Sequence, residues 1–403
     1  MTVNNKNNFF TFFCLYIAQQ IPMSFFATII PVIMRQEKFS LFTIGFTVAI
    51  LKVPWILKFL WSPVVDRFNV TIRDYKQWII LSELVFAFFI FSVTFFDFVT
   101  SFYAILVVII LSFFASATGD IATDALATQS FDRKNKSMIN SMQSMGSFGG
   151  AMIGGGVLLW IYKQTEWSHL THLLAFIVIL ALLPLFFNRG LTINRDHSVV
   201  KQVKMEDLLH FFTQHGIWKQ IGLLLLYYVS MIGTLAMISP YLVDLGYDTK
   251  QIGTMRGFLG PATGLVASFA GGLIIHKIGR HYSRILFSIL ILFTTFYFYW
   301  ISTTLHPEIQ LLYIGILLLW GSYGMATVVV YTLSMDRARK GREGTDFTIQ
   351  TVLSHLSGII IVMVSGKIAY YAGYTNLFLF EFGLACLSLV YVLFVFRKKE
   401  END

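Results

Sequence analysis

The stretch GDIATDALAT (residues 119–128) places two carboxylates inside an apolar run that begins near Phe102. On a helix, Asp120, Asp124 and Thr128 recur at every fourth residue and form one polar stripe, while the apolar side chains face lipid or neighbouring helices. An ionisable residue inside a membrane segment is by default a candidate functional residue. The two acids are therefore expected to face the same space and are the first candidates for chemistry.

The composition of the whole chain is that of a membrane protein. The 403 residues are 56% hydrophobic and only 13% charged, with a mean hydropathy of +0.68, far from the range of soluble globular domains. The alternating pattern of an outer-membrane barrel is absent, so we expect helical spans. Cys14 and Cys386 lie at opposite ends of the chain and indicate neither a disulfide framework nor a metal site. We therefore predict an all-α polytopic membrane protein without metal or cofactor.

About twelve segments are long and apolar enough to span a bilayer, since a span needs about 20 mainly apolar residues. They cover residues 9–33, 40–61, 76–97, 100–128, 137–161, 169–187, 216–243, 249–274, 281–304, 308–335, 344–371 and 374–396. The longest polar interval separates the first six spans from the last six. We predict two six-helix bundles, residues 1–187 and 216–403, joined by a cytoplasmic linker over residues 188–215.

The distribution of Lys and Arg predicts the orientation of the chain. The loops on one side hold 21 of these residues and the loops on the other side hold four. Because cytoplasmic loops carry the excess of positive residues, both termini are predicted to be cytoplasmic, which agrees with an even number of spans. The same clustering accounts for the formal net charge of +8, so this charge does not indicate a nucleic-acid partner.

Short motifs recur between the two halves at similar spacing. The pairs are residues 43–46 with 251–253, 131–133 with 335–337, and 66–67 with 276–277, at spacings of 208, 204 and 210 residues. Such offsets are expected of two parallel six-helix repeats with a binding site at their interface. Charged residues in these motifs form a predicted cytoplasmic gate of Asp66, Arg67, Asp132, Arg133, Asp336 and Arg337. Within it, we expect Asp66-Arg67 either to be an inter-helix latch that is closed in the outward-open state or only to determine the topology.

Helical depth predicts the partners of the two acids. Counted from the cytoplasmic helix ends, Asp120 and Lys52 lie about 18 and 21 Å deep, and Asp124 and Lys58 each lie about 12 Å deep. An unpaired charge there would cost about 2.5–3.5 kcal/mol. We expect Lys52 to pair with Asp120, and Lys58 either to pair with Asp124 or to extend to the cytoplasmic surface. Such pairs either only hold the spans together, or keep one acid ionised while the other, preferably Asp124, binds and releases a proton.

Polar and aromatic side chains on several spans are candidates for the wall of a solute cavity. Gln20 and Ser24 either donate hydrogen bonds to a polar solute or join two helices. Arg256 either binds an anionic group of the solute or extends to the outer surface. The expected cavity residues are Tyr16, Gln20, Ser24, Thr128, Tyr227, Thr234, Arg256, Tyr323, Thr327 and Tyr331. Ionisable residues also fall within or near other spans, at Glu83, His355, Lys367 and Glu381.

Other motifs separate packing from chemistry. Gly146, Gly150 and Gly154 form a stripe of small residues that lets another helix approach closely. The sequence has no Walker motif, no paired His/Cys ligands and no Gly-x-Ser-x-Gly elbow, which disfavours an ATP-driven pump and a soluble-type hydrolase. A membrane-embedded transferase would need a convergent acid/base or metal constellation. The acids lie on one helix without His partners nearby in sequence, so we expect a transporter and not an enzyme.

Three motifs together resemble the AmpG family of muropeptide permeases within the major facilitator superfamily. They are TIGF (43–46), KFLWSP (58–63) with Asp66-Arg67, and Asp120-Ile121 with Asp124-Ala125. The resemblance covers mainly the first 130 residues, and the related acetyl-CoA transporters carry a similar pair of motifs. It implies a major facilitator fold, and Lys58, Asp66, Asp120 and Asp124 would take the family's motif positions.

The resemblance also implies a function. It is that of a proton-coupled importer in the bacterial inner membrane, with an anhydro-muropeptide or related cell-wall recycling product as its small-molecule substrate. Its partners would be protons and membrane lipid, and we expect a monomer. Two features depart from the family: Gly119 stands where many members have Gln, and well-known members carry extra spans. A siderophore or other small-metabolite permease of the same superfamily is therefore the alternative.

Overall fold

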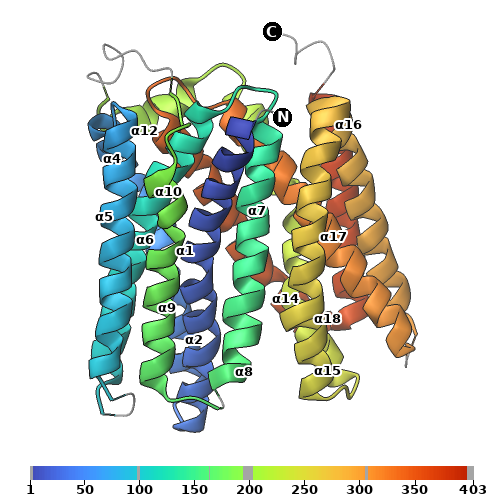
Figure 1. The fold of residues 1–403 in the computed structure, drawn as a ribbon. Helices are drawn as coiled ribbons and strands as arrows, with labels where there is room; N and C mark the ends of the chain where they lie inside the picture. Colours follow the sequence, from blue (N-terminus) through green and yellow to red (C-terminus); the bar gives the residue numbers. More distant parts are fainter. Residues whose placement is uncertain (1–2, 98–99, 163, 194–202, 305–306, 397–403) are drawn as a thin grey trace. The chain divides into compact units, whose positions relative to one another are not determined.

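The computed structural model describes residues 3–97, 100–162, 164–193, 203–304 and 307–396. Helices make up the regular structure of these residues, and no strand occurs among them (Figure 1). The predicted all-α fold is therefore confirmed. Residues 194–202 of the predicted linker lie outside the described residues.

The described helices provide for twelve membrane spans, as the hydropathy predicts. In the described ranges, nine helices are long and apolar enough to cross a membrane, and the bent pair 42–51 and 53–60 makes a tenth. Two of the nine, Lys250–Ser302 and Glu343–Val395, have 53 residues each, about 80 Å of helix against a bilayer core of about 30 Å. Each breaks at a glycine with positive φ, Gly279 (83°) or Gly373 (80°), and so contributes two spans.

The chain forms two compact units. Unit 1 consists of Met1–Asp132, Gly146–His210 and Arg337–Ile349, and unit 2 of Arg133–Met145, Phe211–Asp336 and Gln350–Asp403. The first six spans are formed by α1 (Val3–Gln36), α2 (Leu41–Leu51), α3 (Val53–Leu57), η1 (Lys58–Leu60), α4 (Ser62–Phe68), α5 (Ile72–Ser92), η2 (Val93–Phe95), α6 (Phe102–Ser130), α7 (Lys136–Met152), η3 (Ile153–Val157), α8 (Leu158–Tyr162), α9 (Trp167–Ala181) and α10 (Leu183–Phe187).

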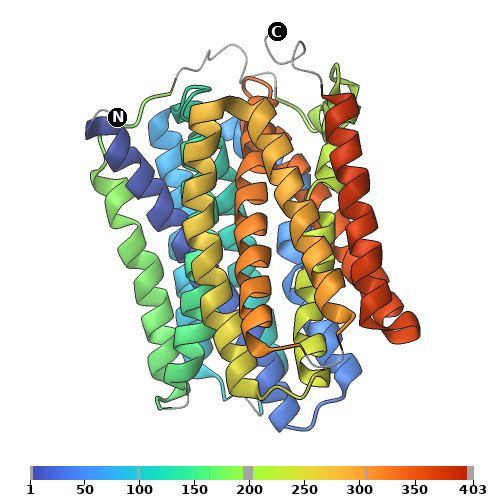
Figure 2. The ribbon, with the colours of Figure 1, turned by 90° about the vertical axis from the view of Figure 1, so that its right-hand side faces the viewer.

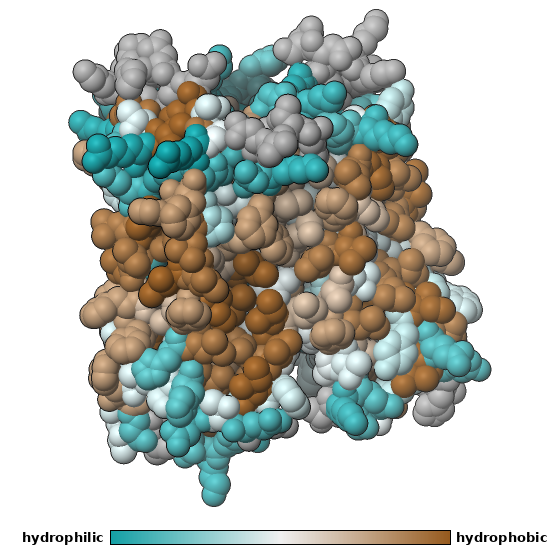
Figure 3. All heavy atoms as spheres, in the orientation of Figure 1, coloured by the Kyte–Doolittle hydropathy of each residue, from teal (hydrophilic) through white to brown (hydrophobic). Residues whose placement is uncertain are grey.

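Later elements begin with the short helices α12 (Asp207–His210) and η4 (Phe211–Thr213). They continue with α13 (Ile217–Leu226), α14 (Val229–Asp244), α15 (Thr249–Gly253), η5 (Thr254–Leu259), α16 (Gly260–Ser302), α17 (Ile309–Asp336) and α18 (Glu343–Val395). In unit 2, α17 runs beside both halves of α16 (Figure 2). On the face shown in Figure 3, apolar residues cover the middle of the helices and hydrophilic residues gather at their ends, as expected of helices that cross a bilayer.

Each unit includes one short segment from the other half of the sequence. Residues 133–145 at the start of the fifth span belong to unit 2, and residues 337–349 at the start of the eleventh belong to unit 1. The two segments are 204 residues apart, the spacing that also separates the motifs 131–133 and 335–337. This match supports two parallel repeats. The predicted boundaries of the two bundles and the linker stay a prediction.

The glycine stripe of the fifth span packs against α1 within unit 1. A Cβ built on Gly150 would lie 2.6 Å from Cβ of Gln20, and one on Gly154 would overlap the carbonyl oxygen of Ile21. Contacts this short leave no room for a methyl group, because packed cores do not deform freely. The close helix approach predicted from the stripe is therefore confirmed.

Substitution of Gly154 by Ala should destabilise the protein by about 1–3 kcal/mol, because the new methyl group would overlap the backbone of α1. Thermal unfolding of the purified full chain in detergent measures this as a lowered Tm. Gly257→Ala is the matched control, since Gly257 also lies in a π-helical segment, η5, but a Cβ added there would meet nothing within 4 Å. Equal Tm values for the two variants would contradict the packing argument.

Candidate functional site

Lys58 and Asp120 form a buried ion pair inside unit 1. Nζ of Lys58 lies 2.5 Å from Oδ2 of Asp120, and the Lys58 side chain is only 2% exposed. Lys58 begins η1, and Asp120 lies on the packed face of α6. Each charge alone would be costly in an apolar interior, so the two charges are stable there only as a pair.

The structure corrects the predicted partner of Asp120. Lys52 is exposed and lies between α2 and α3, where the span bends by 40° just before Pro54. The prediction counted depth along one straight helix, and the bend invalidates that count. Lys58 is the residue that pairs with Asp120, and its burial shows that it does not extend to the cytoplasmic surface.

Asp124 is held by a phenol. Oη of Tyr16 on α1 donates a hydrogen bond of 2.8 Å to Oδ1 of Asp124, and both side chains are buried. One turn later on α6, the Thr128 hydroxyl donates to the Asp124 backbone carbonyl at 2.8 Å. Asp124 is therefore placed beside a neutral group that can donate or accept a hydrogen bond.

A third carboxyl lies beside this cluster, and its place there was hardly visible in the sequence. Glu83 on α5 is 1% exposed, and its Oε1 accepts a hydrogen bond of 2.8 Å from Nε2 of Gln19 on α1. A Cβ built on Gly119 would lie 3.0 Å from the same oxygen, so Glu83 packs against the α6 backbone next to Asp120. A possible signal was its position 11 residues into the span, about 16 Å deep, close to the depth inferred for Asp120.

Gln20 and Ser24, which were also expected in the cavity wall, form a hydrogen bond with each other on α1. Nε2 of Gln20 donates to the Ser24 hydroxyl at 2.7 Å, and both side chains are partly exposed. Tyr16 is buried against Asp124. Of this group, Gln20 and Ser24 are the accessible ones.

The residues of unit 2 that were expected in the cavity wall also divide into buried and accessible ones. Tyr227 and Thr234 are buried, and their hydroxyls donate to the backbone carbonyls of Arg284 (2.7 Å) and Ser230 (2.9 Å). They therefore do not line an open cavity here, because a hydroxyl in an apolar interior must find an internal acceptor. The exposed Arg256 donates to the Ser239 hydroxyl at 2.5 Å.

On α17 the expected stripe is partly accessible. Tyr323 and Tyr331 are partly exposed, and Thr327 is buried with its hydroxyl on the Tyr323 carbonyl. The ring of Tyr323 also packs edge-on against Tyr228 at 5.7 Å between ring centres. In unit 2, Tyr323, Tyr331 and Arg256 are thus the candidates that a solute could reach.

Asp66 at the end of the second span binds the start of α18. Its carboxylate accepts hydrogen bonds from the backbone N–H of Gly344 (3.1 Å) and of Thr345 (2.7 Å) and from the Thr345 hydroxyl (2.8 Å). Asp66 is fully buried, while Arg67 is exposed. A carboxylate at a helix N-terminus meets free N–H groups and the positive end of the helix dipole. The latch geometry therefore involves Asp66, and not the Arg67 side chain.

Two further acids hold the same segment of unit 1. Asp346 accepts hydrogen bonds from the Arg339 side chain at 2.8 and 2.7 Å. Asp207 of α12 accepts from Nε of Arg342 at 2.6 Å. Burial by itself would raise the pKa of Asp207, but the bonds from Arg342 and the Lys204 N–H, with the nearby guanidinium charges, lower that pKa overall. Asp207 therefore stays ionised at neutral pH and binds the linker to residues 339–342.

Unit 2 has its own polar contacts around residues 133–145. Asp336 at the end of α17 accepts from Nε of Arg280 at 2.5 Å and lies 3.7 Å from Nζ of Lys136. His276 contacts the Lys134 carbonyl oxygen at 3.0 Å. The remaining predicted gate side chains, Asp132, Arg133 and Arg337, are exposed.

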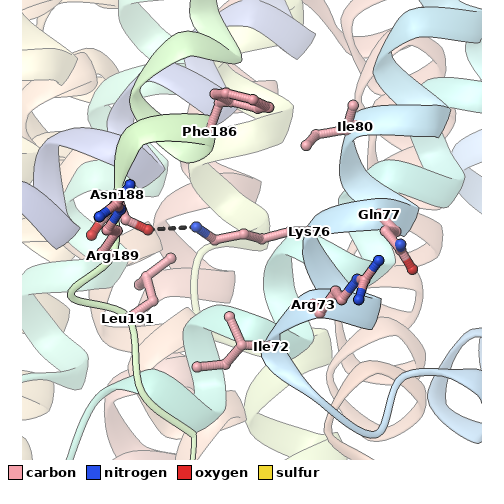
Figure 4. A pocket seen from close by; sticks show the side chains of 9 residues that line it. All are labelled: Ile72, Arg73, Lys76, Gln77, Ile80, Phe186, Asn188, Arg189 and Leu191. Carbon is pink, nitrogen blue, oxygen red and sulfur yellow. Dashed lines mark hydrogen bonds between the residues drawn. The ribbon is translucent and has the colours of Figure 1, made fainter.

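A surface pocket of about 570 Å³ lies elsewhere in unit 1. It is formed by the start of α5 and the end of α10, and Figure 4 shows the Lys76 ammonium reaching the Asn188 carbonyl oxygen across it. None of the predicted solute-binding residues lines this pocket. Among the described residues, no group of three or more His, Cys, Asp or Glu side chains could hold a metal ion.

A family model for the Major Facilitator Superfamily matches residues 9–362. The chain belongs to this superfamily. It is similar to the putative transporter AmpG 4 of Rickettsia felis, with 23% identity over 97% of this chain and 96% of the relative. The anhydromuropeptide permease of Escherichia coli strain K12 is 22% identical over 93% of this chain and 77% of its own length. The human organic anion transporter MFSD10 has a similar fold, with a TM-score of 0.72, 14% identity, and coverage of 97% of this chain and 100% of that one.

These similarities confirm the resemblance to AmpG-type permeases. As a major facilitator, the chain is a secondary transporter of a small-molecule substrate and not an enzyme. It is a multi-pass protein of the bacterial inner membrane.

Lys58→Gln should lower the free energy of unfolding of the protein by about 3–5 kcal/mol, because it leaves a buried Asp120 carboxylate without its cation. Thermal unfolding and the yield of monodisperse protein measure the loss. Adding Asp120→Asn to Lys58→Gln should recover part of it, since the double variant has no unpaired charge. Lys52→Gln is the control, because the Lys52 side chain is exposed. If Lys52→Gln costs as much as Lys58→Gln, the assignment of the ion pair is wrong.

Asp66→Asn should loosen residues 337–349 and slow transport several-fold without abolishing solute binding. A neutral amide offers one acceptor oxygen and no charge to the three donors, and the loss of such bonds is worth about 1–3 kcal/mol. Hydrogen–deuterium exchange of peptides from this segment, together with turnover, measures the effect. Arg67→Gln should leave both near wild type. An unchanged exchange rate in Asp66→Asn would refute the latch.

Proposed function

We propose that this transporter imports an anhydro-muropeptide or a related cell-wall recycling product together with protons, as a monomer with both termini in the cytoplasm. The observation that carries the proposal is the contrast between two acids one turn apart on α6. Asp120 is paired with the Lys58 ammonium at 2.5 Å, whereas Asp124 accepts a bond from the Tyr16 phenol at 2.8 Å.

The two partners respond differently to protonation. Protonating Asp120 would remove its charge and leave the buried Lys58 ammonium without a counter-ion, which is costly. Protonating Asp124 can keep its bond with Tyr16, because a phenol donates to a carboxylate and can accept from a carboxylic acid. Asp124 is therefore the acid suited to bind and release a proton, with Asp120 and Lys58 as a permanently charged pair.

The substrate proposal rests on the relatives and on the accessible polar groups. Two curated relatives are named as an AmpG transporter and an anhydromuropeptide permease. A muropeptide offers sugar hydroxyls, amides and carboxylates. Gln20 and Ser24 in unit 1, and Arg256, Tyr323 and Tyr331 in unit 2, are accessible groups that can bind such a solute.

Opening towards the cytoplasm is proposed to break the network around residues 337–349. Asp66 holds Gly344 and Thr345, and Asp207 holds Arg342. In both contacts a carboxylate accepts hydrogen bonds from backbone N–H groups or from a guanidinium. Water can form these hydrogen bonds instead when residues 337–349 move away from the two carboxylates. In unit 2, the contacts of Asp336 with Arg280 and Lys136 are proposed to act in the same step.

Flux into proteoliposomes under an imposed pH gradient tests the substrate and the coupling together. Radiolabelled anhydro-muropeptide should accumulate when the outside is acidic, and should only equilibrate without the gradient. A ferric siderophore in parallel tests the alternative permease. Accumulation of the siderophore and not of the muropeptide would overturn the substrate proposal, and accumulation independent of the gradient would overturn proton coupling.

Asp124→Asn should keep solute binding and exchange but lose accumulation driven by the pH gradient, because the amide keeps its bond to Tyr16 and cannot change charge. Counterflow and gradient-driven uptake in the same proteoliposomes separate these two properties. Asp120→Asn should mainly lower folding yield, since Lys58 is left unpaired. If Asp124→Asn still concentrates solute while folded Asp120→Asn does not, the roles of the two acids are reversed.

A further inference from the structure

Glu83 is a buried carboxyl that the ion pair of the cluster does not neutralise. Its side chain is 1% exposed, and its Oε1 accepts one hydrogen bond from the neutral Gln19 amide at 2.8 Å. Within the described residues, Oε2 of Glu83 has no hydrogen-bond partner. A carboxylate in such a place would be an uncompensated charge, which costs far more than a buried neutral carboxylic acid.

The groups around Glu83 make a negative charge less favourable still. On α6 the nearest residue is Gly119, followed directly by Asp120, whose charge repels a carboxylate at Glu83. On α1 the facing groups are Gln19 and, one turn away, Tyr16. On α9, the ring of His172 contacts Phe91 instead, eight residues beyond Glu83, about 12 Å along α5. The cation of the cluster, Lys58, is bound to Asp120.

The packing of α5 and α6 determines the position of the Glu83 side chain. It lies on the buried face of α5 with Ile79, Ser82 and Phe86. Gly119 leaves the space that the carboxyl fills, because a Cβ at that position would lie 3.0 Å from Oε1. The cluster therefore contains three buried carboxyls, Glu83, Asp120 and Asp124, and the salt bridge of one lysine.

We propose that Glu83 is a second proton-binding residue of the transport cycle, in addition to Asp124. The inference rests on the proposed proton coupling. Glu83 is neutral in the arrangement described here. It loses its proton to water when the cycle opens its surroundings, and it takes one proton from water on the other side before it is buried again. No other bond forms or breaks, and the Gln19 amide serves both forms, since its nitrogen donates to the carboxylate and its oxygen can accept from the acid.

Infrared spectroscopy of the purified protein in nanodiscs, titrated with pH, tests this without any substrate. A protonated carboxylic acid has a carbonyl band that a carboxylate lacks. The wild type should show such bands near neutral pH, and Glu83→Gln should lack one that the wild type loses on alkaline titration. Glu381→Gln is the matched control. Glu381 in unit 2 is also fully buried, but it accepts its hydrogen bond, of 2.5 Å, from the Ser365 hydroxyl and not from an amide. Because its surroundings differ from those of Glu83, Glu381→Gln should remove a different carbonyl band.

Transport with radiolabelled anhydro-muropeptide and a pH-sensitive dye inside the vesicles gives the second readout. Glu83→Gln should lower the number of protons carried per solute, while counterflow exchange and the value for Glu381→Gln stay as in the wild type. A wild-type proton ratio in Glu83→Gln, or spectra in which no titrating band disappears, would overturn the proposal. Should Glu83→Gln not fold, Glu83→Asp keeps a carboxyl but withdraws it from Gln19, and it should shift the titration of the band.

The two experiments separate this inference from the proposed function. A titrating Glu83 band without any muropeptide flux would refute the substrate and leave the proton site standing. Proton-driven muropeptide uptake with an unchanged proton ratio in Glu83→Gln would refute the Glu83 site and leave the proposed function standing.

Discussion

The buried ion pair between Lys58 and Asp120 is the constraint on which the polar interior of unit 1 depends. Two charges are tolerated in an apolar environment only because their atoms lie 2.5 Å apart. Once Lys58 is engaged in this way, the neighbouring acids are held by neutral donors, Asp124 by Tyr16 and Glu83 by Gln19. These two donors come from α1, which the glycine stripe of the fifth span lets pack closely. Helix packing and acid chemistry are therefore linked through α1.

The contacts at the helix ends follow the repeat, while their chemistry does not. Residues 337–349 and 133–145 are equivalent segments, 204 residues apart, and each belongs to the unit of the opposite half. The first is held by the Asp66 carboxylate on three donors and by Asp207. The second is contacted by the His276 ring, and Lys136 within it lies near Asp336. Charged groups therefore hold both segments, the first through the carboxylates of Asp66 and Asp207 and the second through the ion pair of Lys136 and Asp336.

The two units also differ in the polar groups that their interiors hold. Unit 1 holds a cluster of three carboxyls and one lysine. In unit 2 the hydroxyls of Tyr227 and Thr234 are used on backbone carbonyls, and the accessible groups are Arg256, Tyr323 and Tyr331. Polar groups that a solute could reach therefore occur in both units, Gln20 and Ser24 in unit 1 and these three in unit 2, while the cluster of acids with a lysine lies in unit 1.

The sequence by itself determined the membrane class, the number of spans and the choice of Asp120 and Asp124 as candidate residues, because these depend on hydrophobicity and on the cost of burying charge, which are local properties. Only the tertiary structure decided which partner each acid has. The bend at Lys52 removed the basis for pairing residues by depth, so Lys58 meets Asp120 instead. Glu83 became prominent only when α5 packed against Gly119 and Gln19. Pairing depends on the rotation and bending of neighbouring helices, and no single segment of sequence encodes either of these.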